Sequence, residues 1–234
     1  MLLFIKDIVK KFDAKEVLNI PQLSISQNEL VGIIGNNGAG KTTMLRLCLD
    51  LLKPESGYIQ IENQNVNTTT SWKAYTSAYI DEHFLIDFLT PEEYFYFTCS
   101  LYGFSERDVN TTLTDFNLFV KNEILNQKVY IEKFSKGNKQ KIGIIGAMLV
   151  RPKLLILDEP FNFLDPSSQV VMKQLLLDYN QKYGTTILLS SHNMECICDI
   201  CTRLIVLEKG KIIKYYDSVD MNVKEELNDY FRLN

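Results

Sequence analysis

The sequence predicts an α/β fold in which helices cover a central, mostly parallel β-sheet, with an antiparallel β subdomain and an inserted α-helical subdomain. Three short runs, LVGIIG at 30–35, LLIL at 154–157 and ILL at 187–189, contain almost no polar side chains. Such runs are typical of strands that are buried on both faces of a sheet. Segments with helical periodicity lie between them, so strands and helices alternate along the chain.

The composition is that of an ordinary globular protein, and 234 residues are enough for one large domain or two small ones. The net charge is −4, so we expect no basic surface for anionic lipid and no nucleic-acid partner. Met1–Ile5 lacks a basic segment and is followed at once by Lys6, so we expect no signal peptide. The longest apolar runs are about half of the roughly 20 residues that span a bilayer, so membrane association is expected to require a partner.

Five cysteines, an odd and unevenly spaced set, indicate reduced thiols in the cytoplasm. Three of them form the cluster CICDIC at 196–201, which could bind a metal ion or simply pack. Met194, Ile197, Cys198 and Cys201 recur at helical spacing as one apolar stripe, whereas Cys196 lies on another face. This periodicity favours packing over metal binding.

The chain up to residue 61 is expected to contain several strands and one helix. Three strand-like runs, LLFIKDIV (2–9), EVLNI (16–20) and LSIS (23–26), precede the first buried strand. A helix is expected over 41–52, where leucines recur at helical spacing, and YIQI at 58–61 alternates as a strand.

Residues 83–143 are expected to form a mainly helical block. Thr90 suits the N-cap of a helix that has Pro91 at its first position, and Gly103 ends this helix. Ser105 suits the N-cap of the next one.

The last third of the chain returns to alternating strands and helices. Its expected elements are a strand at 154–157, a helix at 167–184, a buried strand at 185–192, a hairpin at 203–215 with its turn at Lys209–Gly210, and a helix at 217–234.

The segment GNNGAGKT at 35–42 matches the phosphate-loop pattern G-x-x-x-x-G-K-[ST] and lies between a predicted buried strand and a predicted helix. Glycines let main-chain amides turn toward phosphate groups, and the N-terminus of the helix adds a positive dipole. Lys41 would reach the β- and γ-phosphates, Thr42 would bind Mg²⁺, and Thr43 would be a further phosphate contact.

Two adjacent carboxylates follow the buried strand in LLILDEP at 154–160. Asp158 would hold Mg²⁺ through water, and Glu159 would act as the general base toward an attacking water. Such a pair can also be a solvated turn, but a phosphate loop upstream needs a partner of this kind.

Five motifs follow one another: GNNGAGKTT, FSKGNKQ, LLILDEP, FNFLDP and LLSSH. In this order they resemble the nucleotide-binding subunit of an ATP-binding-cassette (ABC) transporter, and the likeness covers residues from about 4 to 214. The resemblance implies a P-loop NTPase fold with a RecA-like core, and ATP and Mg²⁺ as ligands. It implies one ABC ATPase domain over 1–234, made of a nucleotide-binding core with its β subdomain (1–82 and 144–216), a helical subdomain (83–143) and a C-terminal helix (217–234).

The resemblance implies roles for the residues that would surround ATP. Phe12 would stack on adenine beside Val17. His192 would sense the γ-phosphate and act in catalysis with Glu159 and Lys41. The phosphates would be surrounded by Asn37, Gly38, Ala39, Gly40, Lys41, Thr42 and Thr43.

The resemblance also implies a head-to-tail dimer of two ATPase subunits. Ser135 and Gly137, in the signature motif FSKGN, would contact the γ-phosphate of ATP held by the other subunit. Asp165, in FNFLDP, would link the two sites.

The sequence departs from the family pattern at two places. The signature has Lys136 and Asn138 where glycine and glutamine are common. The family's glutamine loop would fall in AYIDEHF, where Glu82 aligns best as a metal ligand, with Asp81 and His83 as alternatives. Glutamate at this place and SKG in the signature resemble exporters of drugs, antimicrobial peptides and polysaccharides more than importers.

By this resemblance the chain is the ATP-hydrolysing subunit that powers a membrane transporter, an exporter of a drug, peptide or similar compound. Its expected partners are a separate transmembrane permease subunit and a second ATPase subunit, identical or similar. It would be cytoplasmic, held at the inner face of the cell membrane by the permease. The alternative is a regulatory subunit that binds ATP but hydrolyses it poorly, and the negative charge disfavours a relative acting on ribosomes or DNA.

The segment 80–97 is rich in aromatic residues and could be either core or a docking surface. We expect most of Phe84, Phe88, Phe95 and Phe97 to lie in the core of the helical block. A minority, at the 84–89 end, is expected to form an exposed patch for the permease.

Overall fold

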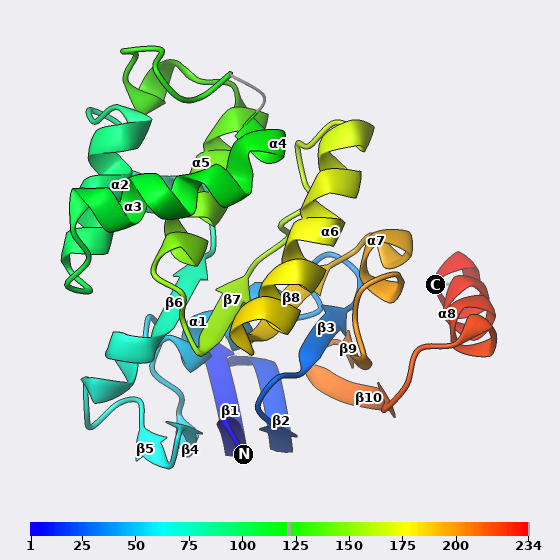
Figure 1. The fold of residues 1–234 in the computed structure, drawn as a ribbon. Coiled ribbons are helices and arrows are strands. Elements are labelled where there is room, and N and C mark those ends of the chain that lie inside the picture. Colours follow the sequence, from blue (N-terminus) through cyan, green and yellow to red (C-terminus); the bar gives the residue numbers. More distant parts are fainter. Residues whose placement is uncertain (121–122, 234) are drawn as a thin grey trace.

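The computed structural model describes residues 1–120 and 123–233, without the side chains of residues 228 and 231–233. Residues 121 and 122 of the expected helical block and residue 234 of the expected C-terminal helix lie outside the described residues. The described elements form two β-sheets and a group of helices (Figure 1). The larger sheet packs against the smaller sheet on one face and against helices on the other.

The smaller sheet is antiparallel, with its strands in the order β2-β1-β4-β5. Its strands are β1 (Leu3–Phe12), β2 (Lys15–Ile25), β4 (Ser56–Ile61) and β5 (Gln64–Asn65). The expectation of two separate strands at 16–20 and 23–26 is wrong, because β2 pairs with β1 along its whole length. Pro21 interrupts the apolar pattern but not the strand, since β2 lies at the edge of this sheet, where a residue without an N–H group is tolerated.

The larger sheet has the strand order β10-β9-β3-β8-β7-β6, and all neighbours except β10 and β9 are parallel. Its strands are β3 (Leu30–Ile34), β6 (Thr76–Tyr79), β7 (Leu154–Leu157), β8 (Thr186–Ser191), β9 (Arg203–Glu208) and β10 (Lys211–Tyr216). The three apolar runs of the sequence are adjacent strands at the centre of this sheet, and the closing hairpin is present, as predicted. Strand β6 was not predicted, because its four residues include Thr76 and Ser77 and lack an apolar run.

The helices lie mainly between the strands of the larger sheet along the chain. They are α1 (Lys41–Cys48), α2 (Pro91–Ser100), α3 (Glu106–Leu113), α4 (Asn117–Val120), α5 (Lys136–Leu149), α6 (Pro166–Tyr183), α7 (Met194–Cys198) and α8 (Met221–Leu233). Short 3₁₀ helices are η1 (Ser71–Tyr75), η2 (Glu82–Phe84), η3 (Thr114–Phe116) and η4 (Ile131–Lys133). Helices α2 to α5 gather at one end of the molecule, away from β1 and β2 (Figure 1), and α5 runs through residue 143 without a break.

Two helix starts in this group follow the predicted capping chemistry. The hydroxyl of Thr90 accepts a hydrogen bond from the main-chain N–H of Glu93, whose carboxylate accepts one from the N–H of Thr90, at 3.3 and 2.8 Å. Ser105 and Asp108 form the same reciprocal pair at the start of α3. The two N-cap predictions are confirmed.

Strand β3 shows how the sequence builds two cores around one sheet. Successive side chains of a strand point to opposite faces. Val31 and Ile33 accordingly belong to the core formed with the smaller sheet and α1, whereas Leu30 and Ile34 belong to the core that includes α5, α6 and α7. All five residues of β3 are buried, as the absence of polar side chains predicted.

The aromatic segment differs from the prediction. Phe95 is fully buried, on a stripe of α2 with Pro91 and Cys99, but Phe84, Phe88 and Phe97 are 51%, 74% and 48% exposed. The expectation that most of these rings are core is wrong. Helix α2 buries only one face, and Phe97 lies on the other. At the 84–89 end, Phe84 and Phe88 are exposed as predicted, whereas Leu85 between them is buried.

All five cysteines are buried. Cys196, assigned to another helix face than Cys198 and Cys201, is also enclosed, with its Sγ 3.5 Å from the Oε1 atom of Gln169. Burial raises the pKa of every thiol, to about 12 for Cys48 and to about 11 for Cys99.

None of the helices in the described ranges combines the length and the apolar character that crossing a membrane requires.

Candidate active site

The loop between β3 and α1 brings Lys41 back over its own main chain. Gly40 has φ +106°, a conformation that favours glycine, and lets α1 begin at Lys41. The Lys41 Nζ atom donates to the carbonyl oxygens of Gly35 and Asn36 at 2.7 and 3.5 Å. A Cβ atom on Gly35 would lie 2.2 Å from the carbonyl oxygen of Leu207, so β9 presses directly on this loop. The ammonium group is thereby fixed at the start of the helix.

Thr42 and Asp158 meet at the carboxyl ends of the parallel strands. The hydroxyl of Thr42 donates to one carboxylate oxygen of Asp158 at 2.6 Å, and the hydroxyl of Ser190, at the end of β8, donates to the other. Burial raises the pKa of the Asp158 carboxyl, whereas the hydrogen bonds from Ser190 and Thr42 act in the opposite direction. The two hydroxyls fix both oxygens of this carboxylate.

Glu159 occupies an unusual backbone position beside Asp158. Its φ is +47°, in the left-handed region, which costs a non-glycine residue about 1–3 kcal/mol. Its N–H donates to the Ser190 hydroxyl at 2.9 Å. One carboxylate oxygen lies 3.2 Å from the Nζ atom of Lys41, and the other lies 2.9 Å from Nδ1 of His192 and accepts from the His192 N–H at 3.2 Å. The left-handed turn thus directs Glu159 between a lysine and a histidine.

Lys41, Thr42, Glu159 and His192 line a cavity of about 420 Å³, the phosphate-loop pocket. It is lined by Phe12, Val17, Asn37, Gly38, Ala39, Gly40, Lys41, Thr42, Thr43, Glu159, Asn162 and His192. The structure therefore brings together the residues that the sequence placed around the base and the phosphates. Phe12 is 45% exposed at the rim, with the Nζ atom of Lys10 5.2 Å from its ring centre.

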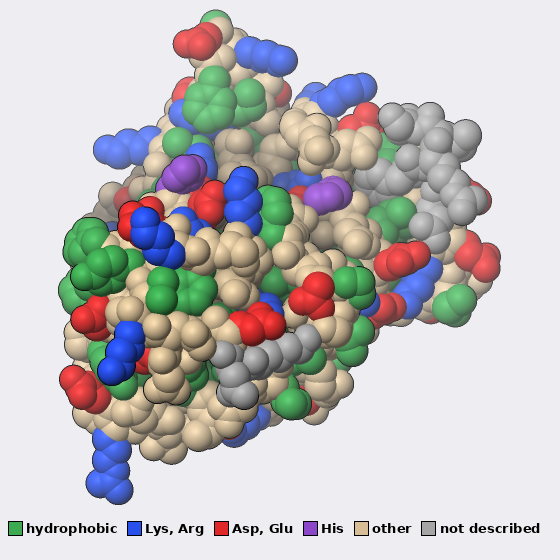
Figure 2. All heavy atoms as spheres, turned by 90° about the horizontal axis from the view of Figure 1, so that it is seen from above, with side chains coloured by type: hydrophobic (Ala, Val, Ile, Leu, Met, Phe, Trp, Pro, Cys, Tyr) green, Lys and Arg blue, Asp and Glu red, His purple; other side chains and the backbone are tan. Residues whose placement is uncertain are grey.

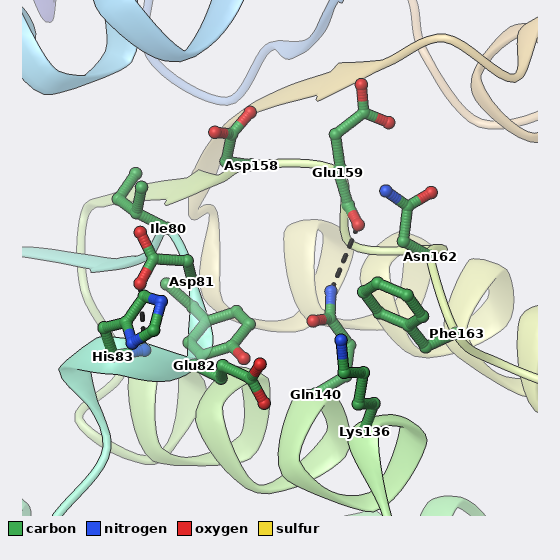
Figure 3. A pocket seen from close by; sticks show the side chains of 11 residues that line it. Ile80, Asp81, Glu82, His83, Lys136, Gln140, Asp158, Glu159, Asn162 and Phe163 are labelled. Carbon is green, nitrogen blue, oxygen red and sulfur yellow. Dashed lines mark hydrogen bonds between the residues drawn. The ribbon is translucent and has the colours of Figure 1, made fainter.

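A second cavity, of about 240 Å³, shares Glu159 and Asn162 with the first, and we call it the α5 pocket. It is lined by Tyr79, Ile80, Asp81, Glu82, His83, Lys136, Gln140, Asp158, Glu159, Asn162 and Phe163. In Figure 3 the carboxylates of Asp158 and Glu159 point away from Gln140, whereas the carbonyl group of Glu159 faces it. On the surface, both histidine side chains lie on one face, with acidic and basic side chains between them (Figure 2).

Glu82 and its two alternatives, Asp81 and His83, all line the α5 pocket. Asp81 is already engaged, because one of its carboxylate oxygens accepts from Arg46 and the other from the N–H of His83, both at 2.9 Å. This leaves Glu82 as the better candidate for a metal-side carboxylate, and that role stays a prediction.

Ser135, Gly137 and Asp165 do not line the phosphate-loop pocket of their own chain. Ser135 caps α5, with its hydroxyl accepting from the N–H of Asn138 at 3.2 Å. Asp165 caps α6 by accepting from the N–H of Ser168 at 3.0 Å. A Cβ atom on Gly137 would lie 2.6 Å from the carbonyl oxygen of Phe163, so the two loops are in direct contact.

Three residues of the site were not singled out from the sequence: Ser190, Gln140 and Asn162. Ser190 follows an apolar run on a buried strand, where a hydroxyl needs a partner, and this is a usable signal. Gln140 lies in a polar stretch and Asn162 lies between two phenylalanines, and neither context gives such a signal.

A profile of the ABC transporter family matches residues 18–162. The chain is 35% identical over 215 residues to the uncharacterized ABC transporter ATP-binding protein YhaQ of Bacillus subtilis (strain 168), covering 90% of this chain and 69% of YhaQ. It is 33% identical over 229 residues to the methionine import ATP-binding protein MetN of the same organism, covering 95% of this chain and 67% of MetN.

Solved structures agree with the sequence relatives. The structure of an ATP binding subunit of an ABC transporter superposes with a TM-score of 0.85 at 28% identity, covering 97% of this chain and 94% of the other. A dimeric ATP-binding cassette bound to ADP and Pi has a TM-score of 0.82 at 23% identity, covering 94% and 99%, and this likeness concerns the fold. The predicted fold class, a mixed α/β P-loop NTPase, is confirmed.

Proposed function

This chain belongs to the ABC transporter family as an ATP-binding subunit with an ATPase domain, and we propose that it powers transport by hydrolysing ATP in the phosphate-loop pocket. The observation that carries the proposal is the position of Glu159. Its carboxylate lies at the edge of that pocket and contacts both Lys41 and His192.

The side chains of the pocket match the needs of phosphoryl transfer to water. Glu159 would accept a proton from the attacking water while the water oxygen bonds to the γ-phosphorus. The bond from that phosphorus to the bridging oxygen then breaks, and ADP and phosphate are released. Lys41 would stabilise negative charge on the phosphates, and His192 would keep the Glu159 carboxylate directed at the reacting atoms.

Thr42 and Asp158 fit a magnesium ion, because a hydroxyl oxygen and a carboxylate oxygen converge to 2.6 Å beside the phosphate loop. When bound, Mg²⁺ would neutralise charge on the β- and γ-phosphates. Asp158 would hold its position through the bond from Ser190, and we propose Glu82 as a further oxygen donor from the α5 pocket.

We propose that two ATPase subunits act together, as a homodimer or with a similar subunit. Ser135, Gly137 and Asp165 lie outside the phosphate-loop pocket of their own chain, which supports a role at the site of a second subunit. A solved structure of the same fold is a dimer.

We propose that a transmembrane permease subunit docks on the exposed rings of Phe84 and Phe88, which would hold the chain at the inner face of the cell membrane. Clustered exposed aromatic side chains are typical of interaction surfaces. Replacing Phe88 by alanine should weaken co-purification with the permease and leave the Kd for ATP unchanged. Equal losses of both would show that the ring only supports the fold.

We propose export of a drug, peptide or similar compound as the direction of transport. The support is the sequence of the α5 pocket, where Glu82 and Lys136 resemble the residues of exporters. The methionine import protein MetN is among the relatives, so the direction is tested directly. The direction is decided by measuring transport in inverted membrane vesicles. An exporter would move its substrate into such vesicles, whereas an importer would not.

The test of the hydrolytic function is the substitution Glu159→Gln in the purified chain. Removing the base should lower kcat by about 100-fold or more, since positioned general bases contribute on the order of 10²–10⁴. Binding of ATP should persist. The same exchange at the exposed Glu195 is the matched control and should leave kcat unchanged. Unchanged turnover in Glu159→Gln would show that another group is the base.

A further inference from the structure

The main chain of Glu159 is held from the side opposite its carboxylate by Gln140 of α5. The side-chain Nε2 atom of Gln140 donates to the carbonyl oxygen of Glu159 at 3.1 Å (Figure 3). Gln140 is 7% exposed, and it lines the α5 pocket but not the phosphate-loop pocket. Its contact with the reaction site therefore runs through the backbone of Glu159.

The backbone of Glu159 needs such support. Its φ of +47° is unfavourable for a residue with a side chain, and the following Pro160 restricts it further. Strained conformations of this kind persist only where the surroundings fix them. Here the N–H of Glu159 donates to the Ser190 hydroxyl of β8. Its carbonyl oxygen accepts from the Gln140 side chain of α5 and from the main-chain N–H of Asn162, each at 3.1 Å, so Gln140 supplies the side-chain bond that ties this turn to α5. Side chains of β8 and α5 thus bind the N–H group and the carbonyl group of Glu159.

The face of α5 that carries Gln140 is packed too closely against its surroundings to move freely. Gly137 and Gly143 flank Gln140 at a spacing of three residues, so the three share one face. A Cβ atom on Gly137 would lie 2.6 Å from the carbonyl oxygen of Phe163, and one on Gly143 would lie 1.9 Å from the ring of Tyr79. The two glycines therefore let this part of α5 lie close to Phe163 and to Tyr79.

We propose that Gln140 is a positioning residue for ATP hydrolysis, which holds the left-handed turn of Glu159 and so directs its carboxylate toward the attacking water. The proposal rests on the proposed hydrolytic function of this pocket. A base must lie within hydrogen-bonding reach of the proton that it removes, and a displacement of about 1 Å can cost on the order of 100-fold in rate. Loss of the Gln140 amide should therefore lower kcat without weakening ATP binding.

The kinetic test compares Gln140→Met, which keeps the length of the side chain but cannot donate, with Gln140→Lys, which restores a donor. We expect kcat to fall about 10- to 100-fold in Gln140→Met, with KM and the Kd for ATP within about twofold of wild type. Gln140→Lys should recover most of the loss. The control Gln174→Met, the same exchange at an exposed position of α6, should match wild type. The proposal is overturned if Gln140→Met keeps its kcat, if kcat and ATP binding fall together, or if the lysine does not recover activity.

A second measurement reports the contact itself and does not depend on catalysis. Glu159–Pro160 is the only Glu-Pro pair in the sequence, so glutamate labelled with ¹³C at the carbonyl and proline labelled with ¹⁵N give one coupled carbonyl signal. This signal should shift in Gln140→Met and return toward its wild-type position in Gln140→Lys. An unmoved signal in Gln140→Met would contradict the proposal. A wild-type chain that bound ATP without hydrolysing it would overturn the proposed function, while the carbonyl signal would still show whether Gln140 holds Glu159.

Discussion

The phosphate-loop pocket and the α5 pocket share Glu159 and Asn162 in their walls, and they are built in different ways. The first takes most of its wall from one continuous segment, residues 37–43, which is the end of the phosphate loop and the first turn of α1, and its glycines and main-chain amides follow directly from a sequence pattern. The second takes its wall from side chains of three separate segments, residues 79–83, 136–140 and 158–163, which packing brings together. The comparison teaches that Glu159 lies between one pocket formed by a local motif and another formed by tertiary contacts.

The largest effect is expected on the phosphate-loop side, from Lys41→Met. The variant loses the ammonium group that would bind the phosphates and that lies 3.2 Å from the Glu159 carboxylate. A hydrogen bond to a charged group contributes about 1.5–3 kcal/mol, so the Kd for ATP should rise about 10- to 100-fold. Equilibrium binding of a fluorescent ATP analogue measures this, with Lys133→Met, at an exposed lysine, as the control. Unchanged affinity would mean that the loop does not hold ATP as proposed.

On the α5 side, Gly143→Ala should destabilise the fold, because the new Cβ atom would lie 1.9 Å from the Tyr79 ring. Overpacking of this kind costs about 1–3 kcal/mol in the free energy of unfolding. The sign of the change in unfolding free energy decides the prediction, because an alanine without crowding would instead stabilise a helix by about 1 kcal/mol. Chemical denaturation measures it. Gly103→Ala, at a positive φ with no atom within 4 Å, separates backbone strain from crowding.

Between the two pockets, Ser190→Ala should affect both stability and turnover. Ser190 is bound to the Asp158 carboxylate and to the N–H of Glu159, so the variant leaves a buried carboxylate short of one donor. We expect a loss of about 1–2 kcal/mol in unfolding free energy and about a tenfold lower kcat. Ser191→Ala, one residue further and also buried, should lose stability but not turnover. Equal kcat in the two variants would contradict the role assigned to Ser190.

The smallest effect is expected far from both pockets, where Asp199 of the α7 end accepts from Lys173 and Lys224 at 2.7 and 2.8 Å. These hydrogen bonds lower the pKa of the Asp199 carboxyl. Its contribution to stability is thus present above the unfolded pKa of about 3.9 and is lost as pH falls through the lower folded value. Because the ion pairs of Asp199 with the two lysines are partly exposed, Asp199→Asn should cost about 0.5 kcal/mol in unfolding free energy at neutral pH. Thermal unfolding at pH 7 and at pH 3 should show the difference at pH 7 and a smaller one at pH 3.

The sequence predicted the parts of the fold whose causes are local. The phosphate loop, the buried strands around Ile33 and Leu188, and the caps at Thr90 and Ser105 depend on residues within a few positions of one another. The structure confirms the buried strands, the two caps and the helix that begins at Lys41 directly after the loop. The assigned roles of the site residues in binding and hydrolysis stay predictions.

The rest could not be predicted, because it depends on contacts between distant segments. Gln140 and Ser190 meet Glu159 across 19 and 31 residues of chain, and neither belongs to a pattern that requires those partners. The short strand β6 forms because it pairs with β7. Strand β2 continues through Pro21 because the residues on both sides of this proline pair with β1. Phe84 and Phe97 are exposed because the rest of the chain does not cover the face of the helical block on which they lie. Periodicity in the sequence does not define which face is covered.

The burial of all five cysteines makes the folded chain nearly inert toward thiol reagents. Their raised pKa values leave little thiolate at neutral pH, and thiolate is the form that reacts. A single cysteine introduced at an exposed position such as Phe88 would therefore carry a fluorescent or spin label alone, without prior removal of the native thiols. The native thiols would then react only as the fold opens, so their labelling rate would report on unfolding in the same sample.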